Sequence, residues 1–166
     1  MFTLKPISLD SVGGALAKAE RYRLLNEPSE AESICRDILE VDPSNREARI
    51  SMILALTDEM AHDPGAFSSA MEAIGGLHVE YDRAYYSGIA WERRAKAAHH
   101  AGGTGSSSYI YDWLVRALHL FEEAERLRPA GNDDAILRWN ACVRFLESHK
   151  DLRPKTEEVP EPILSE

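Results

Sequence analysis

The sequence predicts an all-α protein, an α-solenoid of about three helical hairpins with a closing C-terminal helix. One observation is a stripe of three small or apolar residues that occurs twice. Its residues are spaced by four and then three positions, and a proline follows five residues after the last of them. A second observation is a third copy of the four-and-three spacing, which lies between these two. It begins 35 residues after the start of the first copy and 51 residues before the start of the last. The three copies are Ala31, Cys35, Ile38 and Pro43; Ala66, Ala70 and Ala73; and Ala117, Phe121, Ala124 and Pro129.

Turn-forming residues divide the first half of the chain into four expected helices. Asn26 can adopt the left-handed conformation that ends a helix, and Pro28 suits the first turn of the next one. Asp42-Pro43 and His62-Asp63-Pro64 provide two further breaks. The expected helices span about residues 8–26, 28–41, 45–61 and 64–74.

The third hairpin is expected to be longer than the others. The offset of 51 residues before the last copy exceeds one repeat by about 17 residues. We therefore predict long helices over 80–101 and 109–127, joined by the flexible segment AGGTGSSS. A closing helix is expected over 133–148. The predicted domain is 1–148, and 149–166 is predicted to be a mobile, acidic, proline-rich tail.

Two segments resemble tetratricopeptide (TPR) repeats, in which two antiparallel helices form a unit of about 34 residues. They are AKAERYRLLNEPSEAESICRDILEVDPSN and WLVRALHLFEEAERLRPAGN. The resemblance covers roughly residues 12–148 and is weakest in the middle unit. Ile38 stands in a slot that is usually small, and His78 stands where the repeat has proline.

The resemblance implies a partner-binding groove. In TPR proteins the first helix of each pair lines an inner groove that holds a peptide or a partner helix. The positions that it implies here are Glu20, Arg23, Ser51, Leu54, Thr57, Ser87, Trp91 and Arg94. The subclass that grips a terminal carboxylate has Lys, Asn and Arg in its groove, whereas this chain offers Gly13, Ala17, Glu47 and Ser51, so that activity is disfavoured.

The composition weighs against nucleic acid and membranes as partners. The chain is 44% hydrophobic and carries a net charge of -9, which repels phosphate backbones and anionic lipid. It contains no stretch of about 18 uninterrupted apolar residues, and its start does not resemble a secretory signal. A cytoplasmic location is therefore expected.

The residues that could support catalysis or metal binding do not form a known motif. Cys35 and Cys142 have no CxxC spacing and are expected to be packed as small apolar residues. GGTGSSS lacks the Lys-Ser/Thr pair of a phosphate-binding loop and is interpreted as a hairpin linker. No histidine pair has the spacing of a helical metal site. We therefore expect no catalytic residues, no metal and no cofactor.

The favoured function is a non-enzymatic protein-interaction module, such as an adaptor, a scaffold or a chaperone-like protein. It would bind a protein or peptide through the groove and the long hairpin, with exposed aromatic residues such as Tyr85 and Trp91 as anchors. One alternative is a structural subunit that forms a homo-oligomer or joins a larger complex. A third is an enzyme whose active site is assembled from residues distant in sequence.

Overall fold

A computed structural model of the chain describes residues 2–102 and 107–154. These residues form a short 3-10 turn, η1 (Leu9–Ser11), and seven α-helices, and none of them lies in a β-strand. The all-α class predicted from the sequence is thus confirmed. The helices are α1 (Val12–Leu24), α2 (Pro28–Val41), α3 (Arg46–Asp58), α4 (Ala66–Gly75), α5 (Glu80–Ala101), α6 (Ser107–Leu127) and α7 (Asp134–Ser148).

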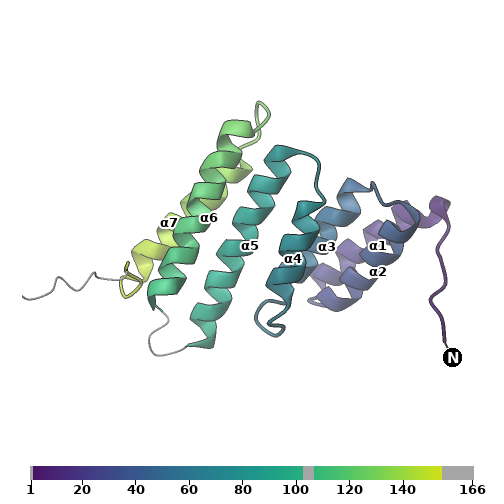
Figure 1. Cartoon of the computed structure of the whole chain (residues 1–166), viewed down its shortest axis with the longest axis horizontal. Helices are drawn as coiled ribbons and strands as arrows, with labels where there is room; N and C mark the ends of the chain where they lie inside the picture. The colour runs from purple at the N-terminus through teal and green to yellow at the C-terminus, as the bar shows by residue number, and fades with distance from the viewer. Residues whose placement is uncertain (1, 103–106, 155–166) are drawn as a thin grey trace, which may run out of the picture.

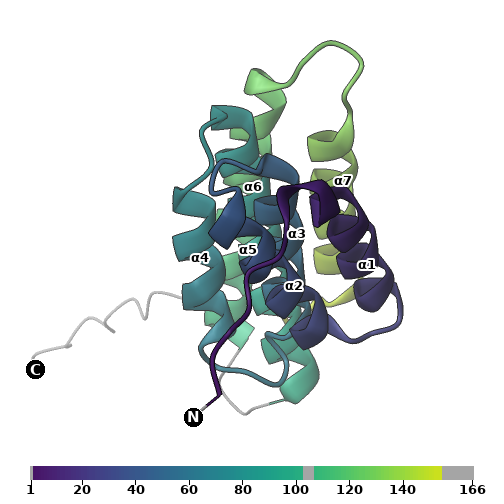
Figure 2. The same cartoon turned by 90° about the vertical axis from the view of Figure 1, so that its right-hand side faces the viewer.

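The helices are stacked in chain order, each packed against the helix before it and the helix after it. In Figure 1 they run from α1 and α2 on the right to α6 and α7 on the left. The odd-numbered helices also contact one another, α1 with α3, α3 with α5 and α5 with α7. The odd-numbered helices therefore form one layer, which we call the odd-helix face. The view turned by 90° looks along this row from the α1 end (Figure 2).

The repeated stripe of each even-numbered helix is buried between two odd-numbered helices. On α2, Ala31 and Cys35 are fully buried in a cluster with Ala19 of α1 and Ala55 of α3. The α4 stripe packs between α3 and α5, and the α6 stripe packs between α5 and α7. Small residues in the stripe allow close approach on both sides, which explains why the spacing repeats.

The helix ends follow from the turn residues. Asn26 has a φ of 61°, the left-handed conformation expected after a helix, and α2 begins at Pro28. Asn45 caps α3, because its side-chain oxygen accepts a hydrogen bond of 2.9 Å from the Ala48 N–H. α3 ends at Asp58, three residues before the predicted end, because the Glu59 carbonyl accepts hydrogen bonds from the His62 and Asp63 N–H groups in a turn.

The long third hairpin is formed by α5, of 22 residues, and α6, of 21 residues. Each helix is roughly 30 Å long. The two helices have the most extensive contact of any pair in the described chain. Gly88 allows α5 and α6 to approach closely, because a Cβ at that position would lie 2.5 Å from Cε1 of Phe121. Phe121 is itself fully buried, so its ring has no room to move aside.

Packed structure continues past residue 148 into the segment that the sequence predicts to be a tail. Leu152 is only 6% exposed and packs against the core between α5, α6 and α7. Its N–H donates to the His149 carbonyl in a turn that folds the chain back after α7. Packed structure therefore extends at least to Leu152, because an apolar side chain in this turn can reach the core. Residues 155–166, the rest of the predicted mobile tail, lie outside the described residues.

Gly88→Ala tests the contact between α5 and α6. The added methyl group would overlap the buried Phe121 ring, and we expect the free energy of unfolding to fall by about 1–3 kcal/mol. Gly14→Ala in α1 is the control, since a Cβ there meets nothing within 4 Å. The control should be neutral or stabilising by up to about 1 kcal/mol. Urea unfolding monitored by circular dichroism measures both, and equal stabilities of the two variants would contradict the close approach.

Candidate functional site

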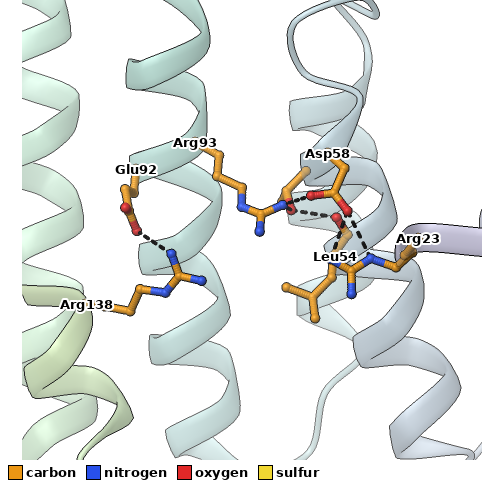
Figure 3. Close-up of polar contacts among 7 residues, drawn as sticks. Arg23, Leu54, Asp58, Glu92, Arg93 and Arg138 are labelled. Atoms are coloured by element: carbon orange, nitrogen blue, oxygen red, sulfur yellow. Dashed lines mark hydrogen bonds and ion pairs between the residues drawn. The ribbon is translucent and has the colours of Figure 1, made fainter. Parts of the chain in front are cut away.

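Two arginines from different helices bind one aspartate on the odd-helix face. Arg23 of α1 donates from Nε and Nη2 to Oδ2 of Asp58 in α3, at 2.9 and 2.8 Å. Arg93 of α5 donates to the other oxygen of Asp58 and, at 3.0 Å, to Oγ1 of Thr57 (Figure 3). Thr57 in turn donates to the Leu54 carbonyl at 2.8 Å. A single carboxylate thus joins three alternate helices.

Further ion pairs extend this pattern along the odd-helix face. Arg46 of α3 binds the buried Asp82 of α5 through Nε and Nη2 at 2.6 and 2.7 Å. Glu92 of α5 is 1% exposed; its Oε1 accepts from Lys96 Nζ at 2.5 Å, and its Oε2 lies 3.5 Å from Nη1 of Arg138 in α7 (Figure 3). Every contact between neighbouring odd-numbered helices therefore includes an arginine–carboxylate pair.

Arg93 remains charged in this setting. Burial lowers the pKa of Arg93 to about 10, and the positive charges of Arg138 and Arg23 act in the same direction. A pKa of about 10 leaves the guanidinium protonated at neutral pH. The row of Arg23, Asp58, Arg93, Glu92 and Arg138 therefore consists of engaged charges that brace the stack.

The structure brings some of the residues predicted for a groove together and separates others. Arg23, Leu54 and Thr57 meet around Asp58. Ser51 and Ser87 are buried, 6% and 9% exposed, and Glu20 is exposed on α1. Tyr85 is half-buried, stacked on Tyr81 and tilted against Phe121 of α6. Trp91 and Arg94 lie on a different face of α5 from Arg93, against α4 and α6.

Five residues of this network were not predicted from the sequence: Asp58, Asp82, Glu92, Arg93 and Arg138. A signal for three of the pairs was present in the spacing of opposite charges. Arg23 and Asp58 are 35 residues apart, Asp58 and Arg93 are 35 apart, and Arg46 and Asp82 are 36 apart. These separations equal about one repeat, so corresponding positions of adjacent hairpins carry charges of opposite sign.

A pocket lies on the other side of α5, between the α3–α4 corner, α4 and α6. We call it the Arg94 pocket; its volume is about 380 Å³. One polar wall is Arg94, and Asp63 lies on the α3–α4 side. The Asp63 carboxylate accepts a hydrogen bond of 2.7 Å from the Gly65 N–H. The apolar walls come from Met60, Pro64, Phe67, Ala98, Ala101 and Trp113.

The Arg94 guanidinium lies between two aromatic rings. Its Cζ is 4.2 Å from the ring centroid of Phe67 and 4.2 Å from that of Trp113, with Trp91 at 5.4 Å. Trp91 meets Phe67 edge to face with 4.7 Å between ring centroids. Each cation–π contact of this kind contributes about 0.5–2 kcal/mol. The rings therefore hold the guanidinium in place without supplying an anionic acceptor for its N–H groups.

Unlike Arg23, Arg93 and Arg138, Arg94 has no anionic partner among the described residues. No described residue forms a hydrogen bond or an ion pair with it, and Asp63 lies beyond ion-pair distance although it lines the same pocket. A planar guanidinium with free N–H edges is suited to bind a carboxylate through two parallel hydrogen bonds. The Arg94 pocket thus combines an oriented cation with apolar walls.

The other candidate chemistries give no assembled site in the described part of the chain. Within residues 2–102 and 107–154, no three His, Cys, Asp or Glu side chains are placed to hold a metal ion. Among the described helices, none is both long and apolar enough to cross a membrane. No protein-family model, no curated protein and no solved structure matches this chain.

Both cysteines are free and fully buried, as the sequence predicts. Burial raises the pKa of the Cys142 thiol to about 12, with the negative charge of Glu92 adding to the effect. Burial also raises the pKa of Cys35. Since the thiolate is the reactive form and both side chains are buried, we expect neither thiol to react in the folded protein.

Alkylation by iodoacetamide at pH 8 tests the state of the thiols. With a pKa of about 12 for Cys142, only about one molecule in 10,000 carries that thiolate at pH 8. We expect no adduct on the native protein and two adducts after unfolding in urea, counted by mass spectrometry. Leu25→Cys, at an exposed position, should add one adduct in the native state. An adduct on the native wild type would contradict the burial of Cys35 and Cys142.

Asp58→Asn tests the bridge between α1, α3 and α5. The change keeps the side-chain size and removes the charge that Arg23 and Arg93 share, so we expect a loss of about 1–2 kcal/mol in the free energy of unfolding. Glu80→Gln is the matched control, because Glu80 is 73% exposed and lies 4.0 Å from Arg83. The control should cost less than about 0.5 kcal/mol. Equal effects in urea unfolding would show that the bridge contributes no more than a surface pair.

Proposed function

We propose that this protein is a non-enzymatic, cytoplasmic interaction module with a TPR-like α-solenoid fold, and that the Arg94 pocket binds a segment of a partner protein. The observation that supports this proposal most is the guanidinium of Arg94, held between Phe67 and Trp113 with no anionic partner among the described residues. A charge that is oriented but not neutralised is a common feature of binding sites.

The chemistry of the pocket defines the class of partner segment. A carboxylate from Asp or Glu satisfies the N–H edges of Arg94, and the apolar walls accommodate an aliphatic or aromatic side chain close to it. The protein carries a net charge of -9, so a separate partner gains little affinity from acidic residues beyond the one that binds Arg94. A short segment in which one acidic residue adjoins a large apolar residue fits best.

The stacked arrangement supports the TPR-like part of the proposal. Each even-numbered helix buries its repeated stripe between two odd-numbered helices, and charge pairs recur at about one repeat length. On the odd-helix face, Arg23 and Thr57 already have partners within the chain. That face remains a predicted contact surface, with Glu20 as its exposed charged residue on α1.

Self-association is the second candidate function. Five of the large apolar residues with the greatest exposure lie at the N-terminal end of the stack, on the extended arm, η1 and the end of α1. Exposed large apolar side chains on one terminal helix of a stack are candidates for burial against a second copy. The residues are Phe2, Leu4, Leu9, Leu24 and Leu25. Light scattering that shows a monomer at high concentration would rule this function out.

Selection from a phage-displayed library of random heptapeptides tests the main proposal. We expect enriched peptides to place Asp or Glu within two residues of Leu, Ile or Phe. Arg94→Gln should weaken their binding about tenfold, because a charge-assisted hydrogen bond contributes about 1.5 kcal/mol or more. Arg94→Lys should recover part of the affinity, since lysine keeps the charge and loses the two parallel hydrogen bonds.

Arg144→Gln is the control for the loss of one positive charge. Arg144 is exposed on α7, away from the residues that line the Arg94 pocket, and its replacement should leave peptide affinity unchanged. Thermal unfolding of each variant establishes that it is folded. Enriched peptides that bind Arg94→Gln as tightly as wild type would contradict the proposal.

A further inference from the structure

The C-terminal segment 155–166 of this chain has the chemistry that the Arg94 pocket selects. Its sequence, KTEEVPEPILSE, has one lysine and four glutamates, a net charge of -3. Glu158 is followed by Val159, and Glu161 precedes Ile163 and Leu164 by two and three residues. Carboxylates thus stand next to large apolar side chains, the combination that an unpaired arginine with apolar walls can bind.

The described chain ends close to the helices that form the pocket. Leu152 is buried in the same core cluster as Ala95 of α5 and Leu114 of α6. Arg94 and Trp113, which line the pocket, are the residues directly before Ala95 and Leu114. Leu152 therefore anchors the end of the described chain on the helix pair that carries the pocket.

The length of the segment is sufficient to reach the pocket. Twelve residues, 155–166, follow the last described residue, and twelve extended residues span roughly 40 Å. Passing around one helix requires a path of only about 10–20 Å, given a helix diameter of about 10 Å.

We propose that residues 155–166 bind in the Arg94 pocket of the same molecule and compete with the partner segment. A glutamate of the segment binds the Arg94 guanidinium, and an apolar residue from 159–164 packs against Phe67 and Trp113. This inference rests on the proposed function, because it assigns a competing ligand to the same pocket. The effective concentration of a short tethered segment is about 1 mM, so even a weak interaction keeps the pocket largely occupied.

The competition makes partner binding dependent on displacement of the chain's own segment. A partner must bind tightly enough to displace the chain's own segment, whose weak intrinsic binding is strengthened because the segment is tethered close to the pocket. Segments with a single acidic residue and poor apolar contacts would then be excluded. The cis-bound segment would thus act as a threshold for partner binding rather than as a permanent block.

The first part of the test uses a fluorescein-labelled peptide of residues 155–166 and full-length protein. In the tail variant, Ile163→Ser with Leu164→Ser, the apolar contacts of the chain's own segment are lost. We expect the labelled peptide to bind the tail variant about fivefold more tightly than wild type, because the tethered competitor is weakened. Adding Arg94→Gln to the tail variant should abolish this gain, and adding Arg144→Gln should preserve it.

The second part uses the indole N–H signals of the three tryptophans in ¹⁵N-labelled protein. The tail variant should shift the signals of Trp91 and Trp113 relative to wild type, with Trp139 of α7 as the reference. The shifts should not depend on protein concentration. Shifts that appear only at high concentration would place the segment in the pocket of a second copy and overturn binding within one molecule.

The remaining outcomes separate this inference from the proposed function. Equal affinity of the labelled peptide for wild type and tail variant overturns occupancy by the chain's own segment. If the labelled peptide binds neither wild type nor the tail variant, occupancy by the chain's own segment is overturned as well. If library-selected peptides still bind in an Arg94-dependent manner, only the inference about residues 155–166 fails. If they do not bind either, the proposed function fails with it.

Discussion

The close approach of α5 and α6 at Gly88 is the constraint on which the rest of the structure depends. Without a Cβ at this position, the fully buried Phe121 ring packs directly on the α5 backbone. The resulting hairpin places α5 against α3, α4, α6 and α7. Three successive side chains of α5 then face different neighbours: Glu92 contacts α7, Arg93 contacts α3, and Arg94 contacts α4 and α6.

The arginines on the two sides of α5 have different roles. On the odd-helix face, Arg23, Arg93 and Arg138 each pair with a carboxylate from a neighbouring helix, so their charges are balanced within the chain and stabilise the stack. Arg94 is held by aromatic rings instead, which orient the guanidinium without neutralising it. The first arrangement stabilises the stack, and the second leaves the guanidinium available for the anionic ligand that we propose.

Much of the fold could be predicted from the sequence, because the features that define it are local. Asn26 and Pro28 mark a helix end and a helix start through backbone preferences of single residues. The stripe on α2 predicts its buried face through helical periodicity alone. The burial of Leu152 was missed, because it depends on a turn after α7 that brings one apolar residue back to the core.

The candidate site was only partly predictable. Trp91 and Arg94 were predicted to line a groove of the odd-numbered helices, whereas they lie against α4 and α6. Their direction depends on how α5 is rotated, and one residue along a helix changes the direction by about 100°. Asp58 was missed because its role depends on two arginines about one repeat away in either direction. Pairs of this kind can be predicted only by comparing charged residues that are one repeat length apart in the sequence.

A double-mutant cycle between Arg94 and the peptide carboxylate tests the central claim most directly. Arg94→Gln is combined with a Glu→Gln change in a library-selected peptide, and all four dissociation constants are measured by calorimetry. If the guanidinium binds the carboxylate, the two changes will be coupled by about 1–3 kcal/mol. Effects that add to within about 0.3 kcal/mol would show that Arg94 does not contact the acidic residue and would contradict the account.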